Sequence, residues 1–390
     1  MSLTRYLPTP SDRMGILWTL LSIEDAIILE YGTAGTTSYV SKVSSILGIN
    51  TENRLFTTTM NQDDVVMGDT KKLEKKIIEL DKTYSPKVIF VMASSVSSVI
   101  GSDVNGVISY MSEEVNAKLI PFTQGGFSGD YSSGIKFVYT KLIKELALDN
   151  YEKENSYNIL GISSMNHSAK LDVLEINNMM SEYFGMKENV VLSYETNIDK
   201  IKKSSKAKIN IVLSYEGLEA AKILKERFDI PYVYKLPIGY KATLEWLLEI
   251  SKILDVNINT DNIQIPNIKP NQNAKALIYA EYDKALGLEE FLKELGINVY
   301  KNISTHNTKK ILNAKITNIK TEKEKLDLFK SLNNTLILGD NTLTKTANNT
   351  NTHINVDNVL LDIPNKSISI FGIKSADYIK QECERYISTI

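Results

Sequence analysis

Short, continuous apolar runs alternate along this chain with longer segments whose apolar positions recur at helical spacing. The clearest runs are residues 87–93 (KVIFVMA), 118–122 (KLIPF) and 208–214 (KINIVLS). A run of this length without polar alternation is typical of a strand that is buried on both faces of a parallel sheet. Segments such as 71–80 and 216–228 have the length and periodicity of amphipathic helices.

The same alternation recurs in three blocks and predicts the fold class. Strands that alternate with helices favour parallel, doubly wound α/β units. We predict three Rossmann-like, doubly wound parallel-sheet domains around a central cleft, over residues 1–153, 154–268 and 269–390. The third domain is the reduced one and carries a C-terminal helix. A length of 390 residues suits two or three domains.

The remaining elements follow from the same pattern. Residues 265–274 are polar, contain proline and indicate a linker, and residues 348–355 (NNTNTHIN) are rich in Asn and Thr and indicate a loop. Further strands are predicted at 157–162, 230–234, 275–280, 297–300 and 335–338, and further helices at 135–148, 171–184, 243–254, 286–295, 323–331 and 378–387.

Charge and composition argue against several classes of protein. The net charge of -2, without a long Lys/Arg block, gives no electrostatic case for nucleic-acid binding. No apolar run approaches the roughly 20 residues that span a bilayer, and residues 1–11 do not have the charged-then-apolar pattern of a signal peptide. We therefore expect a cytoplasmic protein that binds neither nucleic acid nor membrane.

Polar turns rich in Gly and Ser follow the first-domain strands. Their backbone N–H groups are suited to cradling an anion, or their glycines allow strand and helix to pack tightly. Neither glycine turn has the GxGxxG or Walker A pattern, and the serines at 94–98 lack a neighbouring base, so a dehydrogenase, an ATPase or a hydrolase is not indicated. Asp103 is expected to cap a turn.

Five phrases in this first block carry a resemblance. They are PSDRMG (10–15), EYGTAGTT (30–37), residues 60–73, the pair Ser94-Ser95 followed by IGSD (100–103), and QGGFSG (124–129). In order and spacing they resemble the nitrogenase component 1 type oxidoreductases, which include subunits of the nitrogenase molybdenum-iron protein and of protochlorophyllide reductase. The second-domain phrases 157–161 and 230–239 fit as well, and the third domain matches more loosely.

The resemblance implies a cofactor-binding cavity or subunit interface at the glycine turns. In relatives the first turn reads roughly Gly-Pro-x-Gly-Cys, and its cysteine binds an iron–sulfur cluster; Thr36 takes that place here, and Ser95 takes the place of a second cysteine. The candidate cavity or interface residues are Gly32, Gly35, Thr36, Ser94, Ser95, Gly125, Gly126 and Phe127.

The side chains available as cluster ligands do not match this resemblance. Clusters are held mainly by thiolates, and Cys383 is the one cysteine of the chain; its setting, QECERY, indicates a surface or half-buried side chain. Hydroxyl groups are poor substitutes because they are far less acidic than thiols. We therefore expect that no cluster and no metal is bound by this chain alone, and that a cluster is held only together with a partner subunit.

The three histidines do not have metal-ligand spacing either. His306 and His353 lie in Asn/Thr-rich segments and are predicted to be exposed. His167 follows the strand predicted at 157–162, where open α/β sheets bind ligands, but a surface loop histidine is the better explanation.

The family resemblance implies a subunit of a two-component oxidoreductase, fed by an ATP-dependent P-loop iron–sulfur reductase and assembled as a homo- or hetero-oligomer with a paralogous subunit. We expect the chain to be such a subunit without cluster ligands, and the sequence identifies neither its catalytic residues nor whether it is active alone. Two alternatives stay open: a non-redox small-ligand-binding or scaffold protein that retains the fold, and a cofactor-assembly scaffold.

Overall fold

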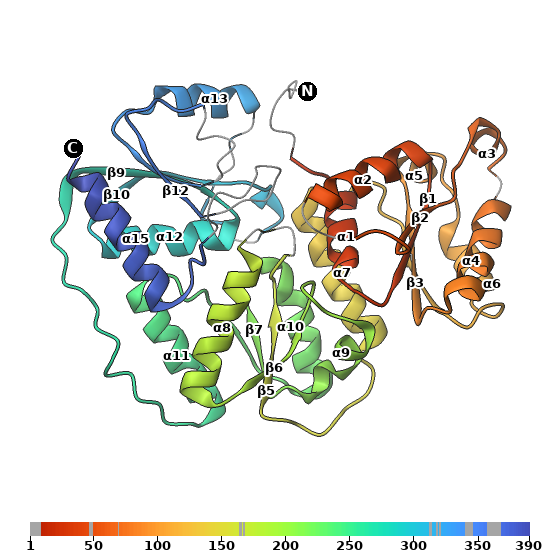
Figure 1. Cartoon of the computed structure of the whole chain (residues 1–390), viewed down its shortest axis with the longest axis horizontal. Coiled ribbons are helices and arrows are strands. Elements are labelled where there is room, and N and C mark those ends of the chain that lie inside the picture. The colour runs from red at the N-terminus through yellow and green to blue at the C-terminus, as the bar shows by residue number, and fades with distance from the viewer. Residues whose placement is uncertain are drawn as a thin grey trace. The chain divides into compact units, whose positions relative to one another are not determined.

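The computed structural model describes residues 9–46, 50–68, 70–163, 166, 168–311, 314–316, 319, 321–339, 346–356 and 368–390. These residues form three four-stranded sheets, and Figure 1 labels their strands apart from β4, β8 and β11. The strand orders are β2-β1-β3-β4, β6-β5-β7-β8 and β10-β9-β11-β12, and every pairing between these strands is parallel. Each order runs outward in both directions from the first strand, as in doubly wound sheets. The predicted α/β fold class is confirmed.

The first sheet is built from the apolar runs of the N-terminal block. Every residue of β1 and β3 is buried, as expected for central strands. The apolar stretch at 14–29 divides into a helix and a strand around Glu24 and Asp25. The strands are β1 (Ile27–Tyr31), β2 (Leu55–Thr57), β3 (Val88–Ala93) and β4 (Lys118–Phe122), and the helices are α1 (Asp12–Leu21), α2 (Ala34–Ile46), α3 (Gln62–Met67), α4 (Lys71–Tyr84), α5 (Ser95–Val99), α6 (Val104–Met111) and α7 (Tyr131–Leu146).

The second sheet follows the predicted pattern and adds one edge strand, β6, that the pattern did not indicate. Gly185 ends α8 in the left-handed conformation with φ +59°, which glycine adopts at low cost. The strands are β5 (Ser156–Leu160), β6 (Lys187–Val191), β7 (Ile209–Val212) and β8 (Tyr232–Tyr234), and the helices are α8 (Ala169–Phe184), α9 (Ile198–Lys202), a 3-10 turn (Lys203–Lys206), α10 (Tyr215–Phe228) and α11 (Tyr240–Leu254).

The third sheet corrects two predictions. Residues 271–274, which the pattern assigns to a linker, are the first part of a strand of this sheet. Residues 348–355 are not all loop, because 352–355 form β12, which pairs in register with β11. An edge strand has one neighbour and one open side, so it tolerates the polar residues that suggested a loop. The strands are β9 (Asn271–Ala280), β10 (Ile297–Ser304), β11 (Leu336–Gly339) and β12 (Thr352–Asn355), and the helical elements are α12 (Tyr282–Glu294), a 3-10 turn (Thr308–Lys310), α13 (Glu322–Ser331) and α15 (Gly372–Ile387).

The chain divides into two compact units. The N-terminal unit comprises residues 10–151 and 192–205, and the C-terminal unit comprises 152–191 and 206–390. The second and third sheets therefore share one unit, and the domain boundaries at 153 and 268 stay a prediction. Segment 192–205 is attached to the N-terminal unit by polar contacts: Ile198 N–H donates to Asp25 (2.8 Å), and Lys87 Nζ lies 2.6 Å from Asp199.

Two glycines bring α1 and α7 into close contact in the N-terminal unit. A Cβ atom on Gly15 would lie 2.0 Å from the carbonyl oxygen of Tyr131, and one on Gly134 would lie 2.0 Å from that of Asp12. No larger residue fits at either position without separating the helices. Among the described residues, no helix is long and apolar enough to cross a membrane.

Candidate functional site

The glycine and serine phrases of the N-terminal block meet at one edge of the first sheet. Parallel strands end at the same edge, so the residues that follow β1, β3 and β4 become neighbours. Ser94 N–H donates to the Tyr31 carbonyl (3.2 Å), and Ser95 Oγ donates to the Gly125 carbonyl (2.6 Å). We call these loops and the first turn of α2 the hydroxyl edge; it contains Gly32, Thr36, Ser94, Ser95, Gly125 and Gly126.

The glycines of the hydroxyl edge provide close packing. A Cβ atom on Gly32 would lie 2.5 Å from Ser94 Cβ, and one on Gly125 would lie 2.1 Å from Ser98 Oγ. Gly126 has φ +100°, a conformation that L side chains rarely adopt. Gly35, in contrast, lies in the first turn of α2 with nothing within 4 Å of an added Cβ atom.

The PSDRMG and EYGTAGTT phrases are joined below this edge by a buried polar network. The Arg13 guanidinium forms an ion pair with Glu30, and Arg13 Nε donates to Glu30 Oε1 at 2.7 Å. Thr37 Oγ1 donates to the other oxygen of that carboxylate at 2.6 Å. All three residues are buried. This network explains why charged residues stand in two otherwise apolar segments.

The residues at the hydroxyl edge do not fit an iron–sulfur cluster. Thr36 is exposed and its hydroxyl donates to the Thr33 carbonyl (3.0 Å), while Ser95 already donates to Gly125. These groups are alcohols rather than thiolates, and an alcohol loses its proton far less readily. Asp103 does cap α6, as predicted, by accepting from Gly106 N–H at 2.9 Å.

Cys383 does not supply a thiolate ligand either. It lies in α15 of the C-terminal unit and is buried, so the prediction of a surface or half-buried thiol is wrong. Burial, and then the charges of Glu382 and Glu384, raise the pKa of the thiol to about 12, which keeps it protonated near neutral pH. In the part of the chain that the structure describes, no three His, Cys, Asp or Glu side chains gather in a way that could hold a metal ion.

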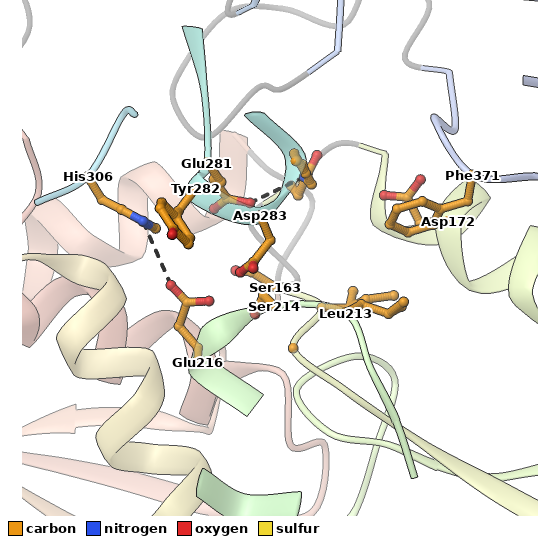
Figure 2. A pocket seen from close by; sticks show the side chains of 14 residues that line it. Ser163, Asp172, Leu213, Ser214, Glu216, Glu281, Tyr282, Asp283, His306 and Phe371 are labelled. Carbon is orange, nitrogen blue, oxygen red and sulfur yellow. Dashed lines mark ion pairs between the residues drawn. The ribbon is translucent and has the colours of Figure 1, made fainter. Parts of the chain in front are cut away.

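A second candidate site lies in the C-terminal unit, where strands of two sheets end around a cavity of about 20 Å³ (Figure 2). A cavity of this size holds about one water molecule. The residues that follow β5 and β7 form one wall, and those that follow β9 and β10 form the other. We call it the acidic pocket; its lining includes Gly161, Ser163, Asp172, Ser214, Glu216, Glu281, Tyr282, Asp283, Lys284, His306 and Phe371.

Close backbone packing shapes one wall of the acidic pocket. Gly161 has φ +94°, and a Cβ atom there would lie 2.6 Å from Ser214 N. A Cβ atom on Gly217 would lie 2.9 Å from Gly161 N. The end of β5 therefore rests directly on the first turn of α10, which brings Glu216 to the pocket.

Asp283 links the two sheets across this pocket. It follows β9 on α12, yet it accepts from Tyr234 Oη of β8 (2.5 Å) and from the backbone N–H of Tyr215 at the start of α10 (2.6 Å). Burial, reinforced by the negative charge of Glu216, raises the pKa of Asp283 to about 7. The carboxyl group therefore gains or loses a proton near neutral pH.

His306 also belongs to the acidic pocket, and the prediction that it is exposed is wrong. It is 2% exposed, and its Nδ1 lies 3.7 Å from Glu216 Oε1; Figure 2 shows the two side chains facing one another. The sequence pattern ended β10 at residue 300, whereas the strand continues to Ser304 and delivers His306 to its carboxyl end. His353, also predicted to be exposed, is half-buried in β12. His167 lies outside the described residues.

The charge of the acidic pocket sets its chemistry. Four carboxylate residues line it (Asp172, Glu216, Glu281 and Asp283), against the potential cations Lys284 and His306. Lys284 Nζ lies 3.2 Å from Glu281. Such a lining disfavours an anion and offers hydrogen bonds and a proton rather than a nucleophile.

Comparison with known proteins establishes the family to which the chain belongs. The family described as Nitrogenase component 1 type Oxidoreductase matches residues 11–365. The chain belongs to this family. The resemblance found in the N-terminal block is thereby confirmed for nearly the whole sequence.

The names of the relatives assign different roles to different members of the family. The chain is 31% identical over 60% of its length to the nitrogenase iron-molybdenum cofactor biosynthesis protein NifE of Clostridium pasteurianum, 51% of which is covered. It is 24% identical over 60% of its length to the nitrogenase molybdenum-iron protein alpha chain of the same organism, 45% of which is covered. It is 25% identical over 55% of its length to a subunit of the light-independent protochlorophyllide reductase of Chloroherpeton thalassium, 40% of which is covered. The chain thus spans about half the length of the curated relatives that it matches.

The fold extends over the whole chain. The solved structure "Nitrogenase Cp1 at pH 6.5" superposes with a TM-score of 0.76 and covers 100% of this chain and 94% of its own, at 15% sequence identity. This likeness establishes a nitrogenase component 1 fold and leaves the chemistry to be argued from the residues.

Proposed function

We propose that this chain is a subunit of a nitrogenase component 1-type complex in which a cysteine-bearing partner chain supplies the cluster ligands. An ATP-dependent iron–sulfur reductase would deliver the electrons, and the complex would work in the cytoplasm. The observation that carries the proposal is the hydroxyl edge. It combines closely packed glycine turns with the hydroxyl groups of Thr36 and Ser95, which stand where the resemblance implies cysteine.

The apolar side chains around this edge support a partner surface. Phe127 is 69% exposed in the loop after β4, and Val99 is 72% exposed at the end of α5. Large exposed apolar residues beside a polar loop set are typical of protein interfaces. Two of the relatives are also named as a chain or subunit of a larger protein.

The test is anaerobic purification of the tagged chain from its own host, with its partners identified by mass spectrometry. We expect a second nitrogenase-like chain that carries cysteines in the matching turns. The variant F127D should reduce its recovery severalfold, because a buried carboxylate opposes association. The matched control is Y300D, since Tyr300 is 60% exposed on β10 of the C-terminal unit. Recovery of a homo-oligomer alone, with F127D unchanged, would contradict the proposal.

A cofactor-assembly scaffold is the second candidate, and the names of the relatives favour it. Three of the most similar relatives are NifE proteins named for iron-molybdenum cofactor biosynthesis. A scaffold would carry metal cargo during assembly and release it afterwards. Iron that is lost on incubation with an acceptor protein would support this role, whereas iron retained through turnover would support the oxidoreductase subunit.

The acidic pocket gives less support to a third role, the binding of a small non-redox ligand, because its cavity holds about one water molecule. It is enclosed by the ends of two sheets, where open α/β folds bind ligands. A metal-free homo-oligomer that co-purifies with a small molecule would favour this role over both others.

A further inference from the structure

A larger cavity, of about 220 Å³, opens in the C-terminal unit away from the acidic pocket. A water molecule occupies roughly 30 Å³ of liquid volume, so the cavity has room for a small organic molecule. Its walls come from α8, α11, the first turn of α15 and residues 262–263. Tyr183 and Asn262 exchange hydrogen bonds of 3.3 and 3.1 Å, which ties the 262–263 segment to α8.

The floor of this cavity is apolar. Met179 of α8, Leu247 of α11 and Ile263 are buried side chains that line it, and Ile373 adds a further apolar group. Covering such a floor with methylene groups is favourable, because it removes apolar surface from water.

Two carboxylates flank this floor along one helix. Glu175 and Glu182 are seven residues apart on α8, which places their Cα atoms about 10.5 Å apart at 1.5 Å per residue. Both line the cavity, and Met179 lies between them on the same helical face. The cavity therefore presents an acid, an apolar surface and a second acid in a row.

The side chains that line this cavity carry a net negative charge. Lys374 is the one cation among the cavity-lining residues that the structure describes, and its charge acts on Glu175. Burial raises the pKa of Glu175, so this carboxylate gains from an added cation. Its environment is crowded by the backbone of Gly372, where a Cβ atom would lie 2.6 Å from Glu175 Oε1.

We propose that this cavity binds a short linear diamine, whose two ammonium groups pair with Glu175 and Glu182 while its methylene chain covers Met179 and Leu247. A diamine matches the lining at three points, whereas a diol lacks the charges and a dicarboxylate has the wrong sign. Lys374 competes with the ligand for Glu175. The inference does not depend on the proposed function.

The test is calorimetric titration of the full chain with cadaverine at low salt, with pentylamine and pentanediol as comparison ligands. We expect saturable binding of cadaverine, weaker binding of pentylamine and none of pentanediol. Low salt matters because exposed charge pairs are screened over about 10 Å at 0.1 M.

Three variants separate the proposed contacts from general charge effects. E182Q should weaken cadaverine binding about two- to fivefold, the range for a lost ion pair at an exposed carboxylate. K374Q should strengthen binding, because it removes the competing cation. E249Q is the matched control, since Glu249 is exposed on α11 outside the cavity. Equal binding by pentanediol, no saturable binding, or equal effects of E182Q and E249Q would overturn the proposal.

Discussion

At the scale of single residues, Asp283 has the environment most sensitive to pH. It is buried, it accepts from Tyr234 and from the Tyr215 N–H, and it lies close enough to Glu216 to be affected by its charge. Its pKa is about 7 in the folded chain against an ordinary value of 3.8. Between these two values the folded state holds a proton that the unfolded state has lost.

This difference predicts how stability depends on pH. The stabilisation from protonated Asp283 is present below about pH 4 and is lost as pH rises to about 7, on the order of 4 kcal/mol in all. The variant D283N has no such proton to lose. The stability of the natural chain relative to D283N should therefore fall as pH rises from 5 to 7.5, measured as melting temperature at each pH.

Two results bear on this prediction. The control D327N, which removes an exposed carboxylate on α13, should leave the pH profile unchanged. A difference between the natural chain and D283N that is constant over this pH range would contradict the assignment to Asp283.

The buried pair of Arg13 and Glu30 gives a second prediction at this scale. Removing one partner leaves the other charge buried, so R13M should lower the free energy of unfolding by about 3–5 kcal/mol. The double variant R13M/E30L removes both charges and should lose less, as measured by denaturant unfolding. A double variant that is less stable than R13M would show that the pair does not act as a buried ion pair.

At the scale of elements, alanine variants can distinguish the glycines that are needed for close packing from a glycine that only adds conformational freedom. G125A and G32A should each lower the free energy of unfolding by about 1–3 kcal/mol, since the added methyl group would overlap Ser98 or Ser94. G35A should raise it by about 0.5–1 kcal/mol, because Gly35 lies in a helix with open space around it. Denaturant midpoints of the three variants test this. Equal effects at Gly35 and Gly125 would contradict the close packing described for the edge.

The sequence pattern predicts well the central strands β3, β5, β7, β9 and β11 and the long helices between strands, but it does not indicate the central strand β1. β4 has the predicted bounds, and β3 differs from its prediction by one residue. β3 owes its pattern to burial on two faces, whereas β4 is an edge strand that still buries Leu119, Ile120 and Phe122. The pattern fails at the edge strands β6 and β12, whose sequences KENVV and THIN are largely polar because an edge strand meets a neighbour on only one side.

The candidate sites differ in the same way. The hydroxyl edge follows from sequence, because its phrases come directly after consecutive strands of one sheet. The acidic pocket does not, since it joins the ends of strands in two sheets whose residues are far apart in the chain. The one signal in the sequence is that Glu216 and Asp283 come shortly after predicted strands. The strand predicted at 297–300 ends four residues before the end of β10, so the sequence pattern does not place His306 directly after a strand.

At the scale of the whole molecule, fold and chemistry separate. The chain keeps a nitrogenase component 1 fold at 15% identity to a solved nitrogenase, over its full length. It nevertheless holds hydroxyl groups, those of Thr36 and Ser95, where the resemblance implies cysteines, and its single thiol is buried in α15. A subunit of this kind would depend on a partner for redox chemistry, which is the central claim of the proposed function.

The most direct measurement of that claim is iron and acid-labile sulfide, quantified anaerobically on the isolated chain and on the complex recovered from its host. The isolated chain, after reconstitution with iron and sulfide and desalting, should retain only background iron. The complex should contain iron and sulfide together with a cysteine-bearing partner. A stoichiometric cluster on the isolated chain would contradict the account.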